Sequence, residues 1–194
     1  MIWQERIFSK DECNKIIEYS NLYSIIEDKF NRDGKFIKNG DITIDGNRLS
    51  HRTAFSYNFY SIPNNDDTEW MFDKLINWFE SKSGVQINTN VKMVDTGLHH
   101  YIKGDKFNKH IDLSPLHPDR RYNLGIQLND NYEGGEYVCW DDMGKEIIIS
   151  KEIGTALAYN CKIEHEIKEI HYGDRWSIVL PLPKQAIIEN KNLL

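Results

Sequence analysis

The chain has few cysteines and no excess of positive charge. Its 194 residues include three cysteines, Cys13, Cys139 and Cys161, which lie far apart and form no CxxC pair. Such a set argues against a disulfide framework, so we expect reduced thiols and a cytoplasmic protein. The 24 basic residues against 30 acidic ones give a net charge of −6. This balance offers no general attraction for nucleic acid, and we expect no nucleic-acid partner.

Long apolar runs are also missing. No run approaches the ~20 apolar residues that span a bilayer, and the charged start MIWQERIFSKDEC lacks the apolar core of a signal peptide. We therefore expect no membrane partner. Apolar residues still make up 40% of the chain and charged residues 28%, a composition typical of globular proteins. The length favours one domain that spans residues 1–194.

Two helices are predicted in the N-terminal part. Ser9-Lys-Asp-Glu12 fits a capping box and precedes apolar residues at helical spacing, which predicts a helix over residues 10–20. Apolar residues three and four apart predict a second helix over residues 66–81. Between them, residues 51–60 alternate like a strand, and the polar stretch 27–50 is predicted to be a long binding loop.

Short runs of β-forming residues, separated by glycine, asparagine or aspartate, fill the rest of the chain. The predicted strands are residues 91–94, 98–102, 122–128, 136–140, 146–149, 155–159, 165–170 and 176–182. Many short strands at this spacing predict a β-sandwich or barrel. The expected class is therefore mainly β (α+β), with residues 1–86 as a supporting region and residues 87–183 as the core.

The segment His110-Ile111-Asp112 offers two candidate metal ligands. If it is a strand, both side chains point the same way, because side chains alternate along a strand. An imidazole and a carboxylate are two ligands of a facial triad, which a distant histidine completes while three positions stay open. His165 is the candidate, because Arg175 follows ten residues later. We expect a hairpin to place both in one barrel interior, where the guanidinium can bind a carboxylate.

Other histidines could compete with His165. In a strand, His171 would point to the same side as His165, but it lies beside a predicted turn. His99 and His100 are adjacent, so one is expected in the core and the other toward solvent. His51 and His117 are expected in loops or on the surface.

Several motifs occur in a characteristic order. They are Tyr101-x-x-Gly-x-x-Phe-x-x-His-x-Asp, Leu128-Asn129-Asp130, Glu133-Gly134-Gly135-Glu136, Gly154 and His165-x-Ile-x-x-Ile-x-x-Gly-x-Arg175. With the opening IFSKDECNKII, this set resembles the Fe(II)/2-oxoglutarate-dependent dioxygenase superfamily, and within it the prolyl 4-hydroxylase-like group. The resemblance covers nearly the whole chain and is weakest over residues 27–50.

The resemblance implies a fold, a reaction and roles for individual residues. The fold is a double-stranded β-helix (a jelly-roll or cupin-like barrel) braced by N-terminal helices. The reaction is hydroxylation of a C–H bond, first of all in a prolyl residue of a peptide or protein, with release of succinate and CO2. The cofactors are Fe(II), 2-oxoglutarate and O2, with ascorbate as a further candidate. The implied site residues are the iron ligands His110, Asp112 and His165, the 2-oxoglutarate-binding residues Tyr101, Arg175 and Ser177, and Arg120 at the substrate cleft.

One position departs from the family pattern, and other functions stay open. Gln127 stands where many relatives carry a tyrosine, which weakens the inference of a prolyl substrate. Amino acids, other side chains and small metabolites are alternative substrates, and nucleic-acid demethylation is a further alternative. A cupin-like metal enzyme that does not use 2-oxoglutarate and a non-catalytic metal-binding module are the alternatives from other classes. Residues 27–50 and 114–121 are the predicted walls of the cleft.

Overall fold

The computed structural model describes residues 1–30, 43–44, 47–48, 55–58, 66–89, 97–113, 115 and 117–188. The predicted strand 91–94, His51, and most of the predicted loop 27–50 lie outside these residues, as do Ser114 and Leu116 of the second predicted loop. Among the described residues, no helix is long and apolar enough to cross a membrane.

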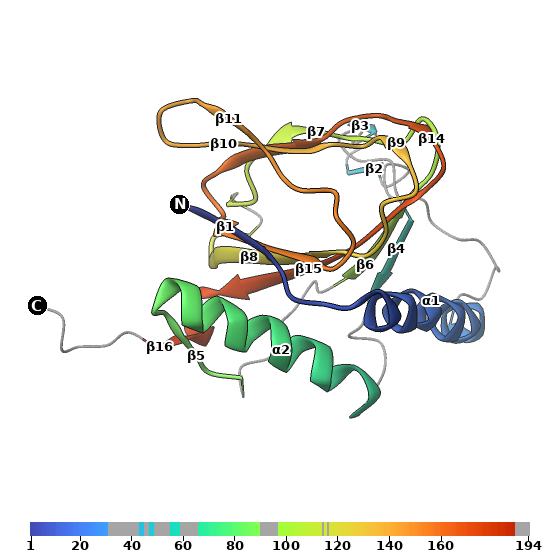
Figure 1. Ribbon diagram of the computed structural model, residues 1–194, viewed down its shortest axis with the longest axis horizontal. Helices are drawn as coiled ribbons and strands as arrows, with labels where there is room; N and C mark the ends of the chain where they lie inside the picture. Colours follow the sequence, from blue (N-terminus) through green and yellow to red (C-terminus); the bar gives the residue numbers. More distant parts are fainter. Residues whose placement is uncertain are drawn as a thin grey trace, which may run out of the picture.

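Two β-sheets face one another and enclose the interior of a barrel (Figure 1). The larger sheet is antiparallel and has six strands, in the order β1 (Ile2–Arg6), β12 (Thr155–Asn160), β8 (Arg120–Gln127), β15 (Arg175–Pro183), β6 (Gly97–Tyr101) and β4 (Phe55–Asn58). The smaller sheet has four, in the order β11 (Glu146–Ile148), β10 (Tyr137–Trp140), β13 (Glu164–Ile167) and β7 (Phe107–His110).

Three short strand pairs and a 3-10 turn complete the described elements. The pairs are β9 (Glu133–Gly134) with β14 (Ile170–Tyr172), β5 (Gln86–Ile87) with β16 (Ile187–Ile188), and β2 (Thr43–Ile44) with β3 (Asn47–Arg48), and the turn is Lys184–Ala186. These elements and the two facing sheets have the mainly β architecture of a double-stranded β-helix, so the predicted fold class is confirmed.

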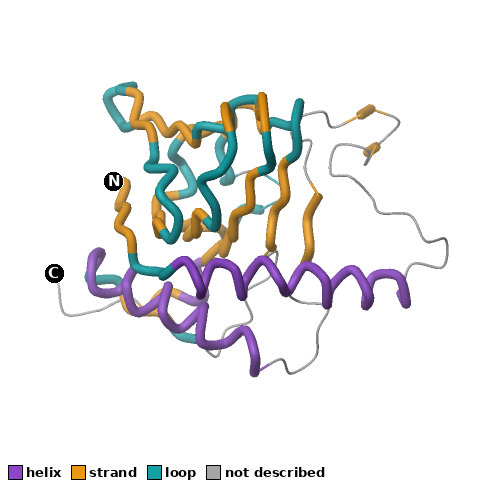
Figure 2. The backbone as a smooth tube through the Cα atoms, turned by 45° about the vertical axis from the view of Figure 1, so that its right-hand side comes forward, coloured by secondary structure: helices purple, strands orange, loops and turns teal. Residues whose placement is uncertain are grey.

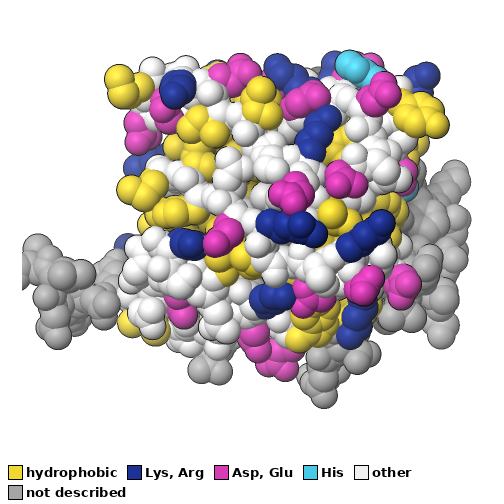
Figure 3. Space-filling view, in the orientation of Figure 1, with side chains coloured by type: hydrophobic (Ala, Val, Ile, Leu, Met, Phe, Trp, Pro, Cys, Tyr) yellow, Lys and Arg dark blue, Asp and Glu magenta, His cyan; other side chains and the backbone are white. Residues whose placement is uncertain are grey.

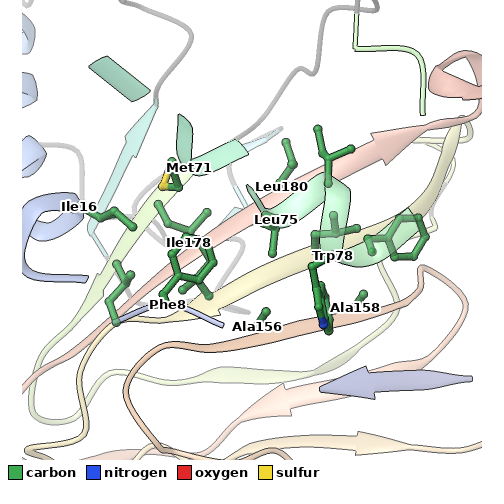
Figure 4. Close-up of a cluster of buried hydrophobic side chains, with 14 of the residues drawn as sticks. Phe8, Ile16, Met71, Leu75, Trp78, Ala156, Ala158, Ile178 and Leu180 are labelled. Carbon is green, nitrogen blue, oxygen red and sulfur yellow. The ribbon is translucent and has the colours of Figure 1, made fainter. Parts of the chain in front are cut away.

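Helices α1 (Lys10–Phe30) and α2 (Asp66–Ser83) cover the outer face of the larger sheet (Figure 2). Because side chains alternate along a strand, Leu124 and Ile126 of β8 point toward these helices while Asn123 and Gln127 point into the barrel. Ile178 and Leu180 of β15 extend the outward-facing apolar set. They pack with residues of both helices in the main hydrophobic core, part of which Figure 4 shows. This layer holds the larger sheet rigid and leaves its inner face free for polar residues.

The helix predictions are confirmed at their starts and differ at their ends. At the start of α1 the backbone N–H of Ser9 donates to Glu12 (2.7 Å), and the N–H of Glu12 donates to the Ser9 hydroxyl (3.2 Å), so the capping box is real. The helix continues to Phe30, beyond the predicted residue 20, and takes in the first residues of the predicted loop. Helix α2 continues to Ser83, two residues past the prediction.

Strand predictions differ from the structure at three places that matter for the site. The predicted strand 165–170 is two strands, β13 and β14, which pair with different partners. Strand β7 ends at His110, so Asp112 lies just after the strand and not on it. Strand β1 has no counterpart in the predicted set, because it is a short edge strand with charged residues, and its pairing with β12 and the packing of Trp3 on the core form only in the fold.

Candidate metal and co-substrate site

Three side chains gather where β7 and β13 pair. His110, the last residue of β7, lies directly opposite His165 of β13. Asp112 follows β7, and its backbone N–H donates to the carbonyl oxygen of Cys161 (3.1 Å). The three side chains each offer one ligand atom, and these atoms lie within 4.8 Å of one another. The carboxylate oxygens of Asp112 lie 3.5 Å from Nε2 of His110 and 3.2 Å from Nε2 of His165.

Both imidazoles are oriented by backbone carbonyl groups. Nδ1 of His110 lies 2.6 Å from the carbonyl oxygen of Asn108, and Nδ1 of His165 lies 3.0 Å from that of Ile163. A carbonyl oxygen only accepts, so Nδ1 carries the hydrogen in each ring and Nε2 presents a lone pair to the centre. Nε2 of His110 is buried and makes no hydrogen bond within the described residues. Such an orphaned acceptor beside a carboxylate fits a bound cation.

Asp112 is ionised in this setting. Burial alone would raise the pKa of its carboxyl group, but the neighbouring imidazoles of His110 and His165 outweigh burial and hold the pKa well below its usual range. Two nitrogen donors and one ionised oxygen donor are the ligand set of a facial triad. The donors present therefore fit Fe(II).

A buried arginine marks a second part of the site. Arg175 of β15 is 3% exposed. Its guanidinium donates to the Ser177 hydroxyl (2.8 Å) and to Oε1 of Gln127 (2.9 Å), while its buried Nε has no hydrogen-bond partner within the described residues. The rings of Tyr101 and Tyr137 lie 5.5 Å and 5.8 Å from the guanidinium carbon. In the described part of the chain these contacts of the charge are all with neutral groups, an arrangement that favours an anionic ligand.

One cavity in the barrel extends from Arg175 toward the triad. Its lining includes Arg175, Gln127 and Ser177 at one side and Asn123, Tyr137 and Tyr159 at the other. Tyr159 reaches the triad, since its hydroxyl lies 3.3 Å from Asp112 Oδ2 and 3.2 Å from His165 Nε2. His110, Asp112 and His165 are not among the lining residues, so the triad meets this cavity through Tyr159.

Two tyrosine hydroxyls form a chain beside the triad. The hydroxyl oxygens of Tyr137 and Tyr159 are 2.6 Å apart. Burial, and for each of them the charge of Asp112, raise the pKa of both phenols well above the usual value, so both stay protonated. The Tyr137 ring also lies parallel to the His165 ring, with centroids 5.7 Å apart. These two tyrosines and Asn123 are absent from the sequence-based set of site residues, and alternation along the strands around 122–128, 136–140 and 155–159 is the only signal that could have shown them.

The structure corrects how two predicted residues come together. His165 and Arg175 do not lie on the two strands of one hairpin, because β13 belongs to the smaller sheet, β15 to the larger one, and β14 intervenes. They reach one interior because the two sheets face each other. Asp112 likewise lies beside His110 because the chain bends after β7, and not because the two side chains alternate along one strand.

The remaining predicted residues take different positions. His171 is exposed on β14, outside the triad, and His117 is exposed as expected. His99 is buried, whereas His100 is partly buried, stacks on Trp176 and lies 2.8 Å from Asp174. Tyr101 and Ser177 lie beside Arg175. Arg120 starts β8 and is not among the residues that line the cavity.

Comparisons with known proteins agree with this geometry. Residues 96–180 match the family model described as the 2OG-Fe(II) oxygenase superfamily. No curated protein matches the chain by sequence. Among solved structures, a 2OG-Fe(II) oxygenase family oxidoreductase from Burkholderia pseudomallei is 16% identical with a TM-score of 0.55; the match covers 68% of this chain and 66% of that one, just under two thirds of its length.

Two prolyl hydroxylases match over most of this chain. A prolyl-4-hydroxylase from Pseudomonas putida is 14% identical with a TM-score of 0.63, and the match covers 94% of this chain and 92% of that one. A prolyl hydroxylase from Trichoplax adhaerens, solved with a hypoxia inducible factor peptide fragment, is 15% identical with a TM-score of 0.66. The match covers 95% of this chain and 83% of that one. At these identities the likeness shows the fold. The predicted resemblance to the 2OG-Fe(II) oxygenase superfamily is confirmed by the family match, which spans the triad and Arg175, and the cofactors that this family implies are Fe(II), 2-oxoglutarate and O2.

Proposed function

We propose that the protein hydroxylates a C–H bond in a peptide or protein, with a prolyl residue as the first candidate, and converts 2-oxoglutarate to succinate and CO2. The observation that carries the proposal is the presence of two complementary sites in one barrel interior. An ionised carboxylate and two imidazoles that fit a cation lie at one end, and the buried guanidinium of Arg175, which fits an anion, lies at the other. Fe(II) and a dicarboxylate would satisfy both.

Each of the site residues has a defined task in this proposal. His110, Asp112 and His165 would hold the iron through Nε2, one carboxylate oxygen and Nε2, and leave positions open for co-substrate and O2. The bound iron supplies oxidation by O2, coupled to decarboxylation of 2-oxoglutarate. Arg175 would bind the far carboxylate, with Ser177 and Tyr101 beside it, and so set the orientation of the co-substrate.

The apolar part of the cavity supports the same assignment. Ile149, Leu157 and Ile167 line the space between the polar ends. An apolar wall shields the cavity from bulk water and strengthens the attraction between Arg175 and a carboxylate. A cupin-like enzyme without 2-oxoglutarate would not need a buried arginine there, and a module that had lost turnover would usually have lost a ligand of the triad first.

The substrate side of the proposal depends on weaker signals. The Trichoplax adhaerens relative was solved with a peptide fragment, which supports a peptide or protein substrate for this chain. We keep Arg120 as a candidate substrate-binding residue, since it starts β8 close to the exposed His117 and Pro118. Positive and negative side chains are interspersed on the face shown in Figure 3, which lacks the single-sign patch that nucleic acid favours. Ascorbate stays a candidate cofactor.

The proposal extends to the organisation of the chain and its compartment. We propose that residues 1–194 are one domain, in which residues 1–86 support the core formed by residues 87–183. Cys13, Cys139 and Cys161 are free and buried, and burial raises the pKa of each thiol to about 12. Unreactive reduced thiols suit the cytoplasm, which is the proposed location.

Removal of the ligand carboxylate should abolish turnover. In Asp112→Ala the site loses its only anionic ligand, so we expect Fe(II)-dependent formation of succinate from 2-oxoglutarate to fall to background. Turnover is measured with a coupled succinate assay on the purified chain. The control is Asp142→Ala, which makes the same change at an exposed position. Wild-type succinate formation in Asp112→Ala would refute the proposed metal site.

A further inference from the structure

One oxygen of the Asp112 carboxylate already has two donors from the barrel interior. The side-chain amide of Asn123 donates through Nδ2 to Oδ2 of Asp112, and the Tyr159 hydroxyl lies 3.3 Å from the same oxygen. Asn123 and Tyr159 are each 2% exposed. Neither residue belongs to the motifs that carry the family resemblance, and neither has been given a role in the function proposed above.

The chemistry of the groups fixes the direction of these hydrogen bonds. An ionised carboxylate only accepts, so the Asn123 amide must present Nδ2 and not Oδ1 to it. Nδ2 also lies 3.2 Å from the Tyr159 hydroxyl oxygen. If the Tyr159 hydroxyl donates its one hydrogen to Asp112, its oxygen is free to accept a hydrogen bond from the Tyr137 hydroxyl, which lies 2.6 Å away. The result is a chain of donors that runs from Tyr137 to Oδ2 of Asp112.

Asn123 and Tyr159 belong to separate strands of the larger sheet. Asn123 lies on β8 and Tyr159 on β12, and the two residues are directly paired in the register of these strands. Asp112 is on the bend after β7, where its backbone N–H donates to the carbonyl oxygen of Cys161. The paired strands therefore add a support at the side chain to a ligand whose own segment is held through its backbone.

The two carboxylate oxygens consequently differ. Oδ2 has the donors Asn123 and Tyr159 and lies 3.2 Å from Nε2 of His165, whereas Oδ1 lies 3.5 Å from Nε2 of His110. We propose that Asn123 and Tyr159 are positioning residues that occupy Oδ2 and thereby hold Asp112 as a one-oxygen ligand of the metal. This inference rests on the metal site of the proposed function. Its consequence is that the carboxylate takes one coordination position and leaves the others for co-substrate and O2.

The test is Mn(II) binding to the full chain, with two readouts. The dissociation constant is measured by calorimetric titration, and the water bound to the ion is measured by the water-proton relaxation enhancement per bound Mn(II). Asn123→Leu keeps the branched shape of the side chain and removes the amide, and Tyr159→Phe removes one oxygen. We expect binding to weaken by about 10- to 100-fold in Asn123→Leu and by less in Tyr159→Phe. The relaxation enhancement should also fall, because a freed Oδ2 displaces water from the ion.

Controls separate this role from a general effect on folding. Tyr122→Phe removes a hydroxyl from the other face of β8, where the ring packs against Trp3 and Phe79, and it should bind Mn(II) like the wild type. Thermal melting of the metal-free variants shows whether each is folded. If Asn123→Leu does not fold, Tyr159→Phe, the smaller change, decides.

The outcomes distinguish this inference from the proposed function. Wild-type affinity in the folded Asn123→Leu and Tyr159→Phe variants overturns it, and so does weaker binding with an unchanged relaxation enhancement. In either case the metal site itself stands if Asp112→Ala loses Mn(II). Absence of Mn(II) binding by the wild type, or full binding by Asp112→Ala, would instead contradict the metal site on which the inference rests.

Discussion

Arg175 is the residue on which the identity of the co-substrate depends. Its charge is buried, and its described hydrogen-bond partners, Ser177 and Gln127, are neutral. Gln127 is itself held in place, because its Nε2 donates to the Tyr132 hydroxyl (2.8 Å) and to the carbonyl oxygen of Asn129 (2.7 Å). The glutamine therefore orients the guanidinium from a fixed position.

Loss of the Gln127 amide should weaken 2-oxoglutarate binding. In Gln127→Leu the guanidinium loses an acceptor for a charge-assisted hydrogen bond, which typically contributes about 1.5–3 kcal/mol. We expect the KM for 2-oxoglutarate to rise by roughly 10-fold or more with little change in kcat, since the bond acts equally in the ground state and the transition state. Gln185→Leu is the matched control, because Gln185 is exposed. An unchanged KM in Gln127→Leu would show that Gln127 does not orient Arg175.

Prediction from sequence worked for some site residues and failed for others, for a physical reason. His110, Asp112 and Arg175 belong to the few residue types that bind metals or carboxylates, and their spacing is a local property of the chain. Asn123, Tyr137 and Tyr159 are ordinary residues of β-strands. They become site residues only because β8, β12 and β10 bring them to Asp112 and His165. That depends on strand pairing, which one sequence without relatives does not specify.

At the scale of elements, the link between α1 and the larger sheet passes through Gly154. This glycine has φ +87° and precedes β12. Its carbonyl oxygen accepts hydrogen bonds from the backbone N–H groups of Ile7 (3.0 Å) and Phe8 (3.1 Å). Its own N–H donates to the backbone carbonyl oxygen of Gln127 (2.8 Å). A Cβ at this position would lie 1.9 Å from the carbonyl oxygen of Phe8. The start of α1 is thus fixed to the sheet at a point where only glycine fits.

Substitution of Gly154 should destabilise the fold more than an ordinary glycine substitution. Gly144 also has positive φ, +75°, but a Cβ there meets no atom within 4 Å. Gly144→Ala should therefore lose only the backbone term, about 1 kcal/mol. Gly154→Ala adds the clash with Phe8, and we expect its free energy of unfolding, measured by urea denaturation, to be lower by at least a further ~1 kcal/mol. Equal losses in the two variants would mean that the loop before α1 moves aside freely.

The elements also show which features of the fold are local. The capping box and the apolar spacing placed the starts of both helices, because these signals act within one turn. The end of α1 and the break between β13 and β14 were not predicted. The break depends on contacts with distant segments: β13 pairs with β7 and β10, whereas β14 pairs with β9. Strand pairing divides this stretch in two, although its sequence reads as one run.

At the scale of the molecule, the two sheets have different roles at the site. The smaller sheet carries His110 and His165, and the larger one carries Arg175, Gln127 and Asn123. The helices pack on the outer face of the larger sheet and leave its inner face to the cavity. The metal site and the carboxylate site therefore face each other across the barrel, which suits a co-substrate that binds both.

The central claim is that the triad and Arg175 bind one molecule of 2-oxoglutarate together with Fe(II). The most direct measurement is an anaerobic titration of the Fe(II)-loaded chain with 2-oxoglutarate, followed through the charge-transfer absorption of a 2-oxo acid chelated to Fe(II). We expect a single saturable complex in the wild type and none in Asp112→Ala. In Arg175→Gln we expect the same absorption at saturation with an affinity at least ~30-fold weaker, since the loss of a buried charge pair is worth about 2 kcal/mol or more. No complex in the wild type, or equal affinity in Arg175→Gln, would contradict the account.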